Sequence, residues 1–285
     1  MNKIYACIDG LPTTAAVVDW AVWAALRLGT PLHLLHTLNP TAEMPIVGDF
    51  SGALGAGTQE LLQRQLSALD EQRGKIAQEA GRQMLDSACE RALAGGAPLV
   101  DQTLHYGELV DALLEREADA RLLVLGENHP ASAPRKLYLS HHLERVVRAV
   151  QRPILVTTAK PFAPPERFVL ACDGSDTARK TVDMVARSPL LQGLPALIAM
   201  VAADTTSAHA ALGQAQSILR SAGFTVSTTL LAGEPEQALP DLLQTQPNAL
   251  LVMGAYGHSR IRQWIVGSTT TALLRLSPVP VLVLR

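Results

Sequence analysis

Glycines and hydroxyl residues near the end of the chain have a spacing that suits phosphate binding. Gly254 and Gly257 are separated by two residues, nine further residues precede Gly267, and Ser268 and Thr269 follow directly. Glycine lets backbone N–H groups turn inward at torsions that a Cβ would disfavour. The N-terminus of a following helix attracts an anion, usually phosphate. We therefore predict an anion site in which Ser268 and Thr269 donate hydroxyls and also cap the helix.

The segments on either side of these glycines read as a strand and a helix. Residues 250–253 form a short apolar run of strand type, and residues 269–276 have a helical pattern. The chain contains no Gly-Lys-Ser or Gly-Lys-Thr, so the loop is not a P-loop. It is not the compact G-x-G-x-x-G dinucleotide turn either. The alternative is a glycine-rich loop that only turns the chain.

The chain repeats itself at a period near half its length. Residues 4–10 (IYACIDG) match residues 168–174 (FVLACDG), 164 positions later. Further matches join 123–126 to 251–254 and 152–156 to 279–283, at offsets of 128 and 127. The first half therefore carries about 38 extra residues between its second and third strands.

Each half reads as alternating strands and helices, which predicts βαβ units and a parallel sheet. In the second half we expect strands near 167–173, 195–201, 225–231, 248–253 and 279–284, and helices near 176–187, 207–222, 234–245 and 269–276. Pro161, Pro164 and Pro165 mark a linker. We predict two domains, 1–160 and 166–285.

The glycine loop resembles the phosphate loop of the universal stress protein family, G-x2-G-x9-G-(S/T). The match includes the leading Met253 and the closing strand at 279–284, and it covers the chain as two tandem copies. The resemblance implies an α/β fold of two doubly wound domains, each a five-stranded parallel sheet of order 3-2-1-4-5 with helices on both faces. It also implies that strands 153–158 and 279–284 join the halves as an intramolecular pseudo-dimer. Whether two chains associate into a homodimer stays open.

The same resemblance implies that the second domain binds ATP or AMP, with or without Mg²⁺. Asp173 would accept hydrogen bonds from ribose hydroxyls, and Val201 would pack on adenine; the alternatives are a turn aspartate and an ordinary strand valine. His258 would approach the phosphates, with surface charge as the alternative. The predicted nucleotide-binding residues are Ala171, Asp173, Val201, Met253, Gly254, Gly257, His258, Gly267, Ser268 and Thr269.

The first copy departs from the loop pattern. Gly126 and Ser140 are kept, but His129 and Leu139 replace the second and third glycines. A Cβ at those points would crowd a phosphate, so we expect the first domain to have lost the family site although Asp9 is kept. A zinc site there is a further candidate, because imidazoles with a carboxylate can ligate zinc. The histidines concerned are His36, His105, His129 and His141, and solvent-exposed or core histidines are the alternative.

Composition excludes several classes of protein. The formal net charge is −2, and basic residues are not interleaved with aromatic ones, which disfavours nucleic-acid binding. Three cysteines without a C-x-x-C favour a reducing, cytoplasmic location. We find neither a signal peptide nor a membrane-spanning segment. In the first half, residues 39–58 read as a mobile loop and 59–94 as a long helix whose apolar stripe, which includes Leu69, Ile76 and Leu93, should pack against the core or the partner domain.

Catalytic motifs are absent from the sequence. Neither G-x-S-x-G nor H-E-x-x-H occurs, and we see no acid–base pair. We therefore expect a nucleotide-binding protein of the stress response that is read by an unknown protein partner, rather than an enzyme. The alternatives are an interaction module with a vestigial loop and a weak ATPase.

Overall fold

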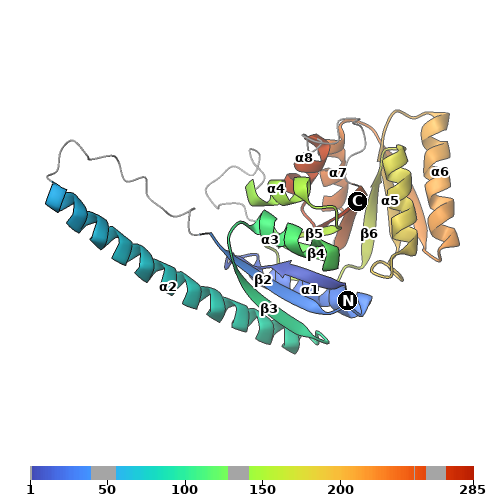
Figure 1. Ribbon diagram of the computed structural model, residues 1–285. Coiled ribbons are helices and arrows are strands. Elements are labelled where there is room, and N and C mark those ends of the chain that lie inside the picture. Colours follow the sequence, from blue (N-terminus) through green and yellow to red (C-terminus); the bar gives the residue numbers. More distant parts are fainter. Residues whose placement is uncertain (1, 40–55, 128–140, 247, 255–267) are drawn as a thin grey trace.

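The computed structural model describes residues 2–39, 56–127, 141–246, 248–254 and 268–285 (Figure 1). Its strands are β1 (Lys3–Cys7), β2 (Leu32–Leu38), β3 (Val100–Tyr106), β4 (Ala120–Gly126), β5 (Ile154–Thr157), β6 (Arg167–Cys172), β7 (Ala196–Val201), β8 (Val226–Leu231), β9 (Ala249–Gly254) and β10 (Val281–Leu284). Its helices are α1 (Thr14–Leu28), α2 (Ala56–Ala94), α3 (Leu109–Arg116), α4 (His141–Ala149), α5 (Asp176–Arg187), α6 (Thr206–Ser221), α7 (Pro235–Gln244) and α8 (Ser268–Leu276), with a 3₁₀ turn η1 (Glu117–Asp119).

The strands form one continuous sheet of ten, in the order β3-β2-β1-β4-β5-β10-β9-β6-β7-β8. Neighbours within each half are parallel, and each half has the order 3-2-1-4-5. The halves meet where β5 pairs antiparallel with β10, with Leu155 opposite Leu282. The predicted α/β fold of two tandem, doubly wound domains is confirmed.

Helices cover both faces of this sheet, and one apolar core lies on each face. The first core joins residues of α1, α2, α5 and α6 to the sheet, and the second joins residues of α3, α4, α7 and α8. Strands buried on both faces need apolar side chains on both, which is why they read as continuous runs of Val, Leu and Ile. Both cores contain residues from both halves, so the domains share their interior.

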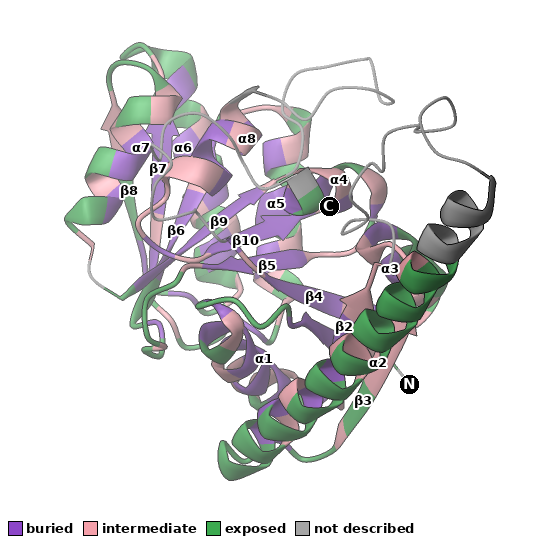
Figure 2. Cartoon of the chain, turned by 90° about the vertical axis from the view of Figure 1, so that its left-hand side faces the viewer, coloured by how far each residue is buried: buried purple, intermediate pink, exposed green. Residues whose placement is uncertain are grey.

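The long helix α2 is only partly buried (Figure 2). It packs through Gly81, Leu85, Ala88 and Ala92, while Leu69, Ile76 and Leu93 are exposed by 52%, 62% and 55%. The predicted core packing of the last three residues is therefore wrong. A 39-residue helix is about 58 Å long, whereas the seven-residue strands β2 and β3 span roughly 23 Å each. The first half of α2 therefore extends past the sheet, as Figure 1 shows.

No helix among the described residues is both long and apolar enough to span a bilayer.

Candidate functional site

The carboxyl ends of β9, β6 and β7 meet at one edge of the second domain. β6 lies between β9 and β7, with Leu170 opposite Val252 and Cys172 opposite Met200. The residue after β6, Asp173, is thereby placed between the ends of β9 and β7, which are Gly254 and Val201. The chain's crossovers change direction on either side of β6, and doubly wound sheets bind ligands at such a point.

Asp173 is held in a tight turn and is exposed. Its Oδ1 accepts a hydrogen bond from the backbone N–H of Ser175 at 2.9 Å, and Gly174 between them has φ +74°. Ser175 in turn caps α5, because its Oγ accepts from the N–H of Ala178 at 3.1 Å. The turn role that we gave as the alternative is therefore present in the structure. It is compatible with ligand contact, since the turn presents the carboxylate at the strand edge.

Gly254 has a structural role that does not involve a ligand. A Cβ at this position would lie 2.4 Å from Oγ1 of Thr181 and 3.4 Å from Cγ2 of Thr177, both on α5. The close packing of α5 on the end of β9 thus requires glycine here. Nothing in the local sequence pattern indicates this contact, because Thr181 is more than seventy positions away.

The remaining predicted residues of these strands differ in accessibility. Ala171 and Val201 are partly buried and pack against the core under α7 and α8. Met253 is 4% exposed and belongs to that core. Its side chain is thus used for packing, and only its backbone lies at the site.

The structure describes only part of the rest of the predicted loop. Gly257, His258 and Gly267 lie outside the described residues. α8 begins at Ser268, and Thr269 lies partly buried in its first turn. The predicted order of strand, loop and helix therefore holds for the strand and the helix on either side.

In the first domain the same framework is present, with Asp9 and Gly10 both exposed, but a different side chain lies beside the turn. Oδ1 of Asp9 accepts from the N–H of Leu11 at 3.0 Å, and Gly10 has φ +73°. However, a Cβ on Gly10 would lie 2.7 Å from Cε of Met84 on α2. The nearest atom to the corresponding Cβ on Gly174 is Cβ of Ala211, at 3.6 Å. Met84 thus crowds the space beside Gly10, whereas Ala211 and Met200 would make only ordinary van der Waals contact with a Cβ on Gly174.

Two of the described histidines of the first domain, His36 and His33, make hydrogen bonds to neighbouring strands or their ends. Nδ1 of His36 lies 2.7 Å from the carbonyl oxygen of Ile8, and Nε2 of His33 lies 2.9 Å from Oγ1 of Thr103. Burial lowers the pKa of His33. Among the described side chains no three His, Cys, Asp or Glu residues group closely enough to hold a metal. His129 and the side chain of His141 lie outside that part of the chain.

The cysteines beside the two Asp-Gly turns are buried thiols. Burial raises the pKa of Cys7 to about 12 and also raises the pKa of Cys172. A thiolate is the reactive form, so both behave as small apolar side chains.

The fold and the edge of β9, β6 and β7 define a class: a tandem, doubly wound α/β protein with a candidate small-molecule site at a strand switch point. The sequence profile of the Universal stress protein family matches residues 1–158 and again 165–285. The chain belongs to this family, in a tandem form.

Known proteins resemble the chain over its full length. It is 32% identical over 288 residues to Universal stress protein Slr1230 of Synechocystis sp. (strain ATCC 27184 / PCC 6803 / Kazusa), covering all of both chains. A crystal structure of a universal stress protein from Archaeoglobus fulgidus DSM 4304 matches with a TM-score of 0.71 and 17% identity, over 100% of this chain and 98% of that one. A putative universal stress protein from Pseudomonas aeruginosa UCBPP-PA14 matches with a TM-score of 0.61 and 17% identity, over 100% and 93%. The two structures support the fold.

Proposed function

We propose that this universal stress protein binds one adenine nucleotide, ATP or AMP, in its second domain (166–285) and that a partner in the cytoplasm senses the occupied state. The observation that carries the proposal is the convergence of Asp173, Val201 and Gly254 at the switch point. α8 follows the loop that carries G-x2-G-x9-G-S.

Each of these groups has a chemistry that suits one part of a nucleotide. An exposed carboxylate accepts hydrogen bonds from two vicinal ribose hydroxyls. A partly exposed valine offers an apolar surface to a base. Backbone N–H groups at the start of a helix bind phosphate. Mg²⁺ arriving with ATP would take most of its ligands from phosphate and water, as it does in many nucleotide sites.

The first domain (1–160) is proposed to lack this activity. His129 and Leu139 replace two of the three loop glycines, and Met84 lies against Gly10. One nucleotide per chain is therefore expected.

The test is nucleotide stoichiometry combined with exchange of residues between the copies. The purified protein is denatured, its small molecules are identified by mass spectrometry, and ATP and AMP affinities are measured by calorimetry. We expect about one equivalent. Gly257→His and Gly267→Leu give the second loop the residues of the first and should abolish binding.

The matched control is His129→Gly, which changes the first loop and should leave the stoichiometry at one. Absence of nucleotide in the purified protein, together with no binding of added ATP or AMP, would overturn the proposal in favour of an interaction module with a vestigial loop.

A further inference from the structure

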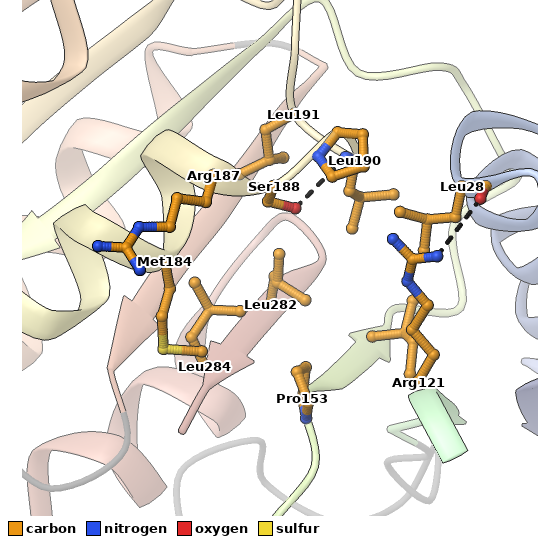
Figure 3. Close-up of a pocket in the computed structure, with 12 residues that line it drawn as sticks. Leu28, Arg121, Pro153, Met184, Arg187, Ser188, Leu190, Leu191, Leu282 and Leu284 are labelled. Carbon is orange, nitrogen blue, oxygen red and sulfur yellow. Dashed lines mark hydrogen bonds between the residues drawn. The ribbon is translucent and has the colours of Figure 1, made fainter. Parts of the chain in front are cut away.

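A cavity lies at the seam between the two domains, away from the edge that carries Asp173 (Figure 3). Its volume is about 350 Å³, within the range of small-molecule pockets. It is walled by the C-terminal ends of α1 and α5, the starts of β4 and β5, and β10. The lining residues are Leu28, Arg121, Leu122, Pro153, Met184, Arg187, Ser188, Pro189, Leu190, Leu191, Leu282 and Leu284.

The lining is apolar with cationic groups at its margin. Leucine, proline and methionine side chains make most of the wall, and they contain no polar atoms other than backbone. Arg121 runs along one side, where its guanidinium donates to the carbonyl of Leu28 at 3.5 Å and to Oγ1 of Thr30 at 3.3 Å. Arg187 lies on the opposite side and is exposed. The lining includes no Asp or Glu, so its formal charge is positive.

The internal repeat shows that large aromatic side chains can fill the equivalent place in the first domain. Met184 and Arg187 correspond, 164 positions apart, to Trp20 and Trp23 of α1. On that side of the seam Trp20 is 4% exposed and meets Trp23 and Phe162 edge to face, with ring centroids 5.2 Å and 5.1 Å apart. Three aromatic rings thus pack one side of the seam, while the other side keeps a cavity.

Hydrogen bonds from the first domain hold the part of the cavity wall that follows α5 in the second domain. Arg27 of α1 donates to the backbone carbonyls of Leu190 and Gln192. Ser188 accepts at Oγ from the N–H of Leu190 at 3.3 Å, as Figure 3 shows. Leu190 and Leu191 are buried. A wall held from both domains favours a preformed pocket, because little ordering is needed when a ligand enters.

We propose that this seam pocket binds a small amphipathic anion, an apolar tail or ring that bears one carboxylate. The leucines bury the apolar part, and Arg121 attracts the carboxylate at the margin, where a charge keeps contact with water; Arg187 adds positive charge on the opposite side. Since both domains contribute lining residues, the ligand stabilises the seam as well as occupying it. The pocket is separate from the nucleotide edge, so this proposal does not depend on nucleotide binding.

The test uses decanoate as the probe, with binding to the full chain measured by calorimetry and by the shift in melting temperature. Met184→Trp gives the pocket the residue that the first domain has in the same place. We expect it to weaken decanoate binding at least tenfold while leaving the melting temperature of the unliganded protein unchanged or raised. Leu284→Phe fills the pocket from β10 and should act in the same direction if the first variant folds poorly.

The matched control is Leu26→Trp. Leu26 is the repeat counterpart of Leu190 but is exposed by 53%, so it adds the same aromatic ring outside the pocket. Decanoate affinity should be unchanged in this variant. Arg121→Gln should weaken decanoate about tenfold and leave 1-octanol, which lacks the charge, unaffected.

Two results would overturn the proposal: no binding of decanoate to the natural chain, or equal effects of Met184→Trp and Leu26→Trp. ATP binding is measured in the same samples. If Met184→Trp still binds ATP, its loss of decanoate binding is independent of the nucleotide site.

Discussion

The two domains place the same Asp-Gly turn at the end of their first strands, but the surroundings of the turn differ. Beside Gly10 stands Met84 of a 39-residue helix, and beside Gly174 stands Ala211 of a 16-residue helix. Both glycines have nearly the same φ. The duplicated chain has thus kept the backbone of the corner in both copies, while the helix that packs over it has changed.

The glycines that end β4 and β9, Gly126 and Gly254, are also kept in both copies, and the reason is packing. Gly126 is kept in the domain whose loop is degraded, because a Cβ there would lie 2.2 Å from Oγ1 of Thr13. Gly254 meets the same two helix positions, but here the closer contact is Thr181, the counterpart of Val17, at 2.4 Å, and the counterpart of Thr13 is Thr177 at 3.4 Å. The first glycine of the motif therefore serves helix packing in both domains, and only the second and third glycines differ between the two copies.

The largest expected effect comes from alanine at these two glycines. Overpacking typically costs about 1–3 kcal/mol. Gly126→Ala should lie at the upper end, about 3 kcal/mol, because its Cβ would also lie 2.6 Å from the Cβ of buried Thr13. Gly254→Ala should cost less, about 1–2 kcal/mol, since only a hydroxyl is in the way. Urea unfolding of both variants measures the difference.

The relief of that clash provides a control. Thr181→Ala removes the hydroxyl and leaves the nearest atom, Cγ2 of Thr177, at 3.4 Å. The double variant Gly254→Ala/Thr181→Ala should therefore be no less stable than Thr181→Ala alone. A full additive loss in the double variant would contradict the packing argument.

The second effect concerns the carboxylates of the two turns. Asp173→Asn keeps an acceptor for the N–H of Ser175 but removes the charge, so nucleotide affinity should fall about tenfold, the equivalent of about 1.4 kcal/mol. Asp9→Asn makes the same change in the first domain, whose loop has His129 and Leu139 in place of two glycines, and should leave affinity unaltered. Calorimetric titration with ATP compares the two, and equal losses would show that the site is not confined to the second domain.

The third effect concerns the glycines of the turns themselves. Alanine is strained at positive φ, so both Gly174→Ala and Gly10→Ala should lower the free energy of unfolding by about 1 kcal/mol. Gly10→Ala should cost slightly more, because Cε of Met84 must also move. In the double variant Gly10→Ala/Met84→Ala, urea unfolding should show that this extra loss of stability is removed. A smaller loss for Gly10→Ala than for Gly174→Ala would contradict the crowding by Met84.

These comparisons also show what the sequence can predict. The second half alternates so regularly that a strand expected near 225–231 is found at Val226–Leu231, and a helix expected at 176–187 has those bounds. Local periodicity suffices for such elements. Helical spacing did not predict the surroundings of Leu69 and Ile76, which belong to α2 as expected but are exposed.

The sequence predicted those residues of the candidate site whose position depends only on the order of the strands. Asp173, Val201 and Gly254 each end a strand, and the order of the sheet brings them to one edge. The contacts of Gly254 with Thr181 and of Gly10 with Met84 were not predictable, since each joins elements that are distant in sequence. The core position of Met253 was missed for the same reason: it depends on α7 and α8 packing over that face.

The smallest effect is a pH dependence that only the first domain should carry. His33 lies where the second domain has Leu197, and burial lowers its pKa below the ordinary value. Its unfolded pKa is about 6.5. The folded state thus disfavours the proton, and stability is full above that value and falls as the pH drops from about 6.5 through the lower folded pKa. His33→Leu, which copies the second domain, should flatten this part of the curve of melting temperature against pH. An unchanged slope between pH 7 and 5 in that variant would assign the dependence to other groups.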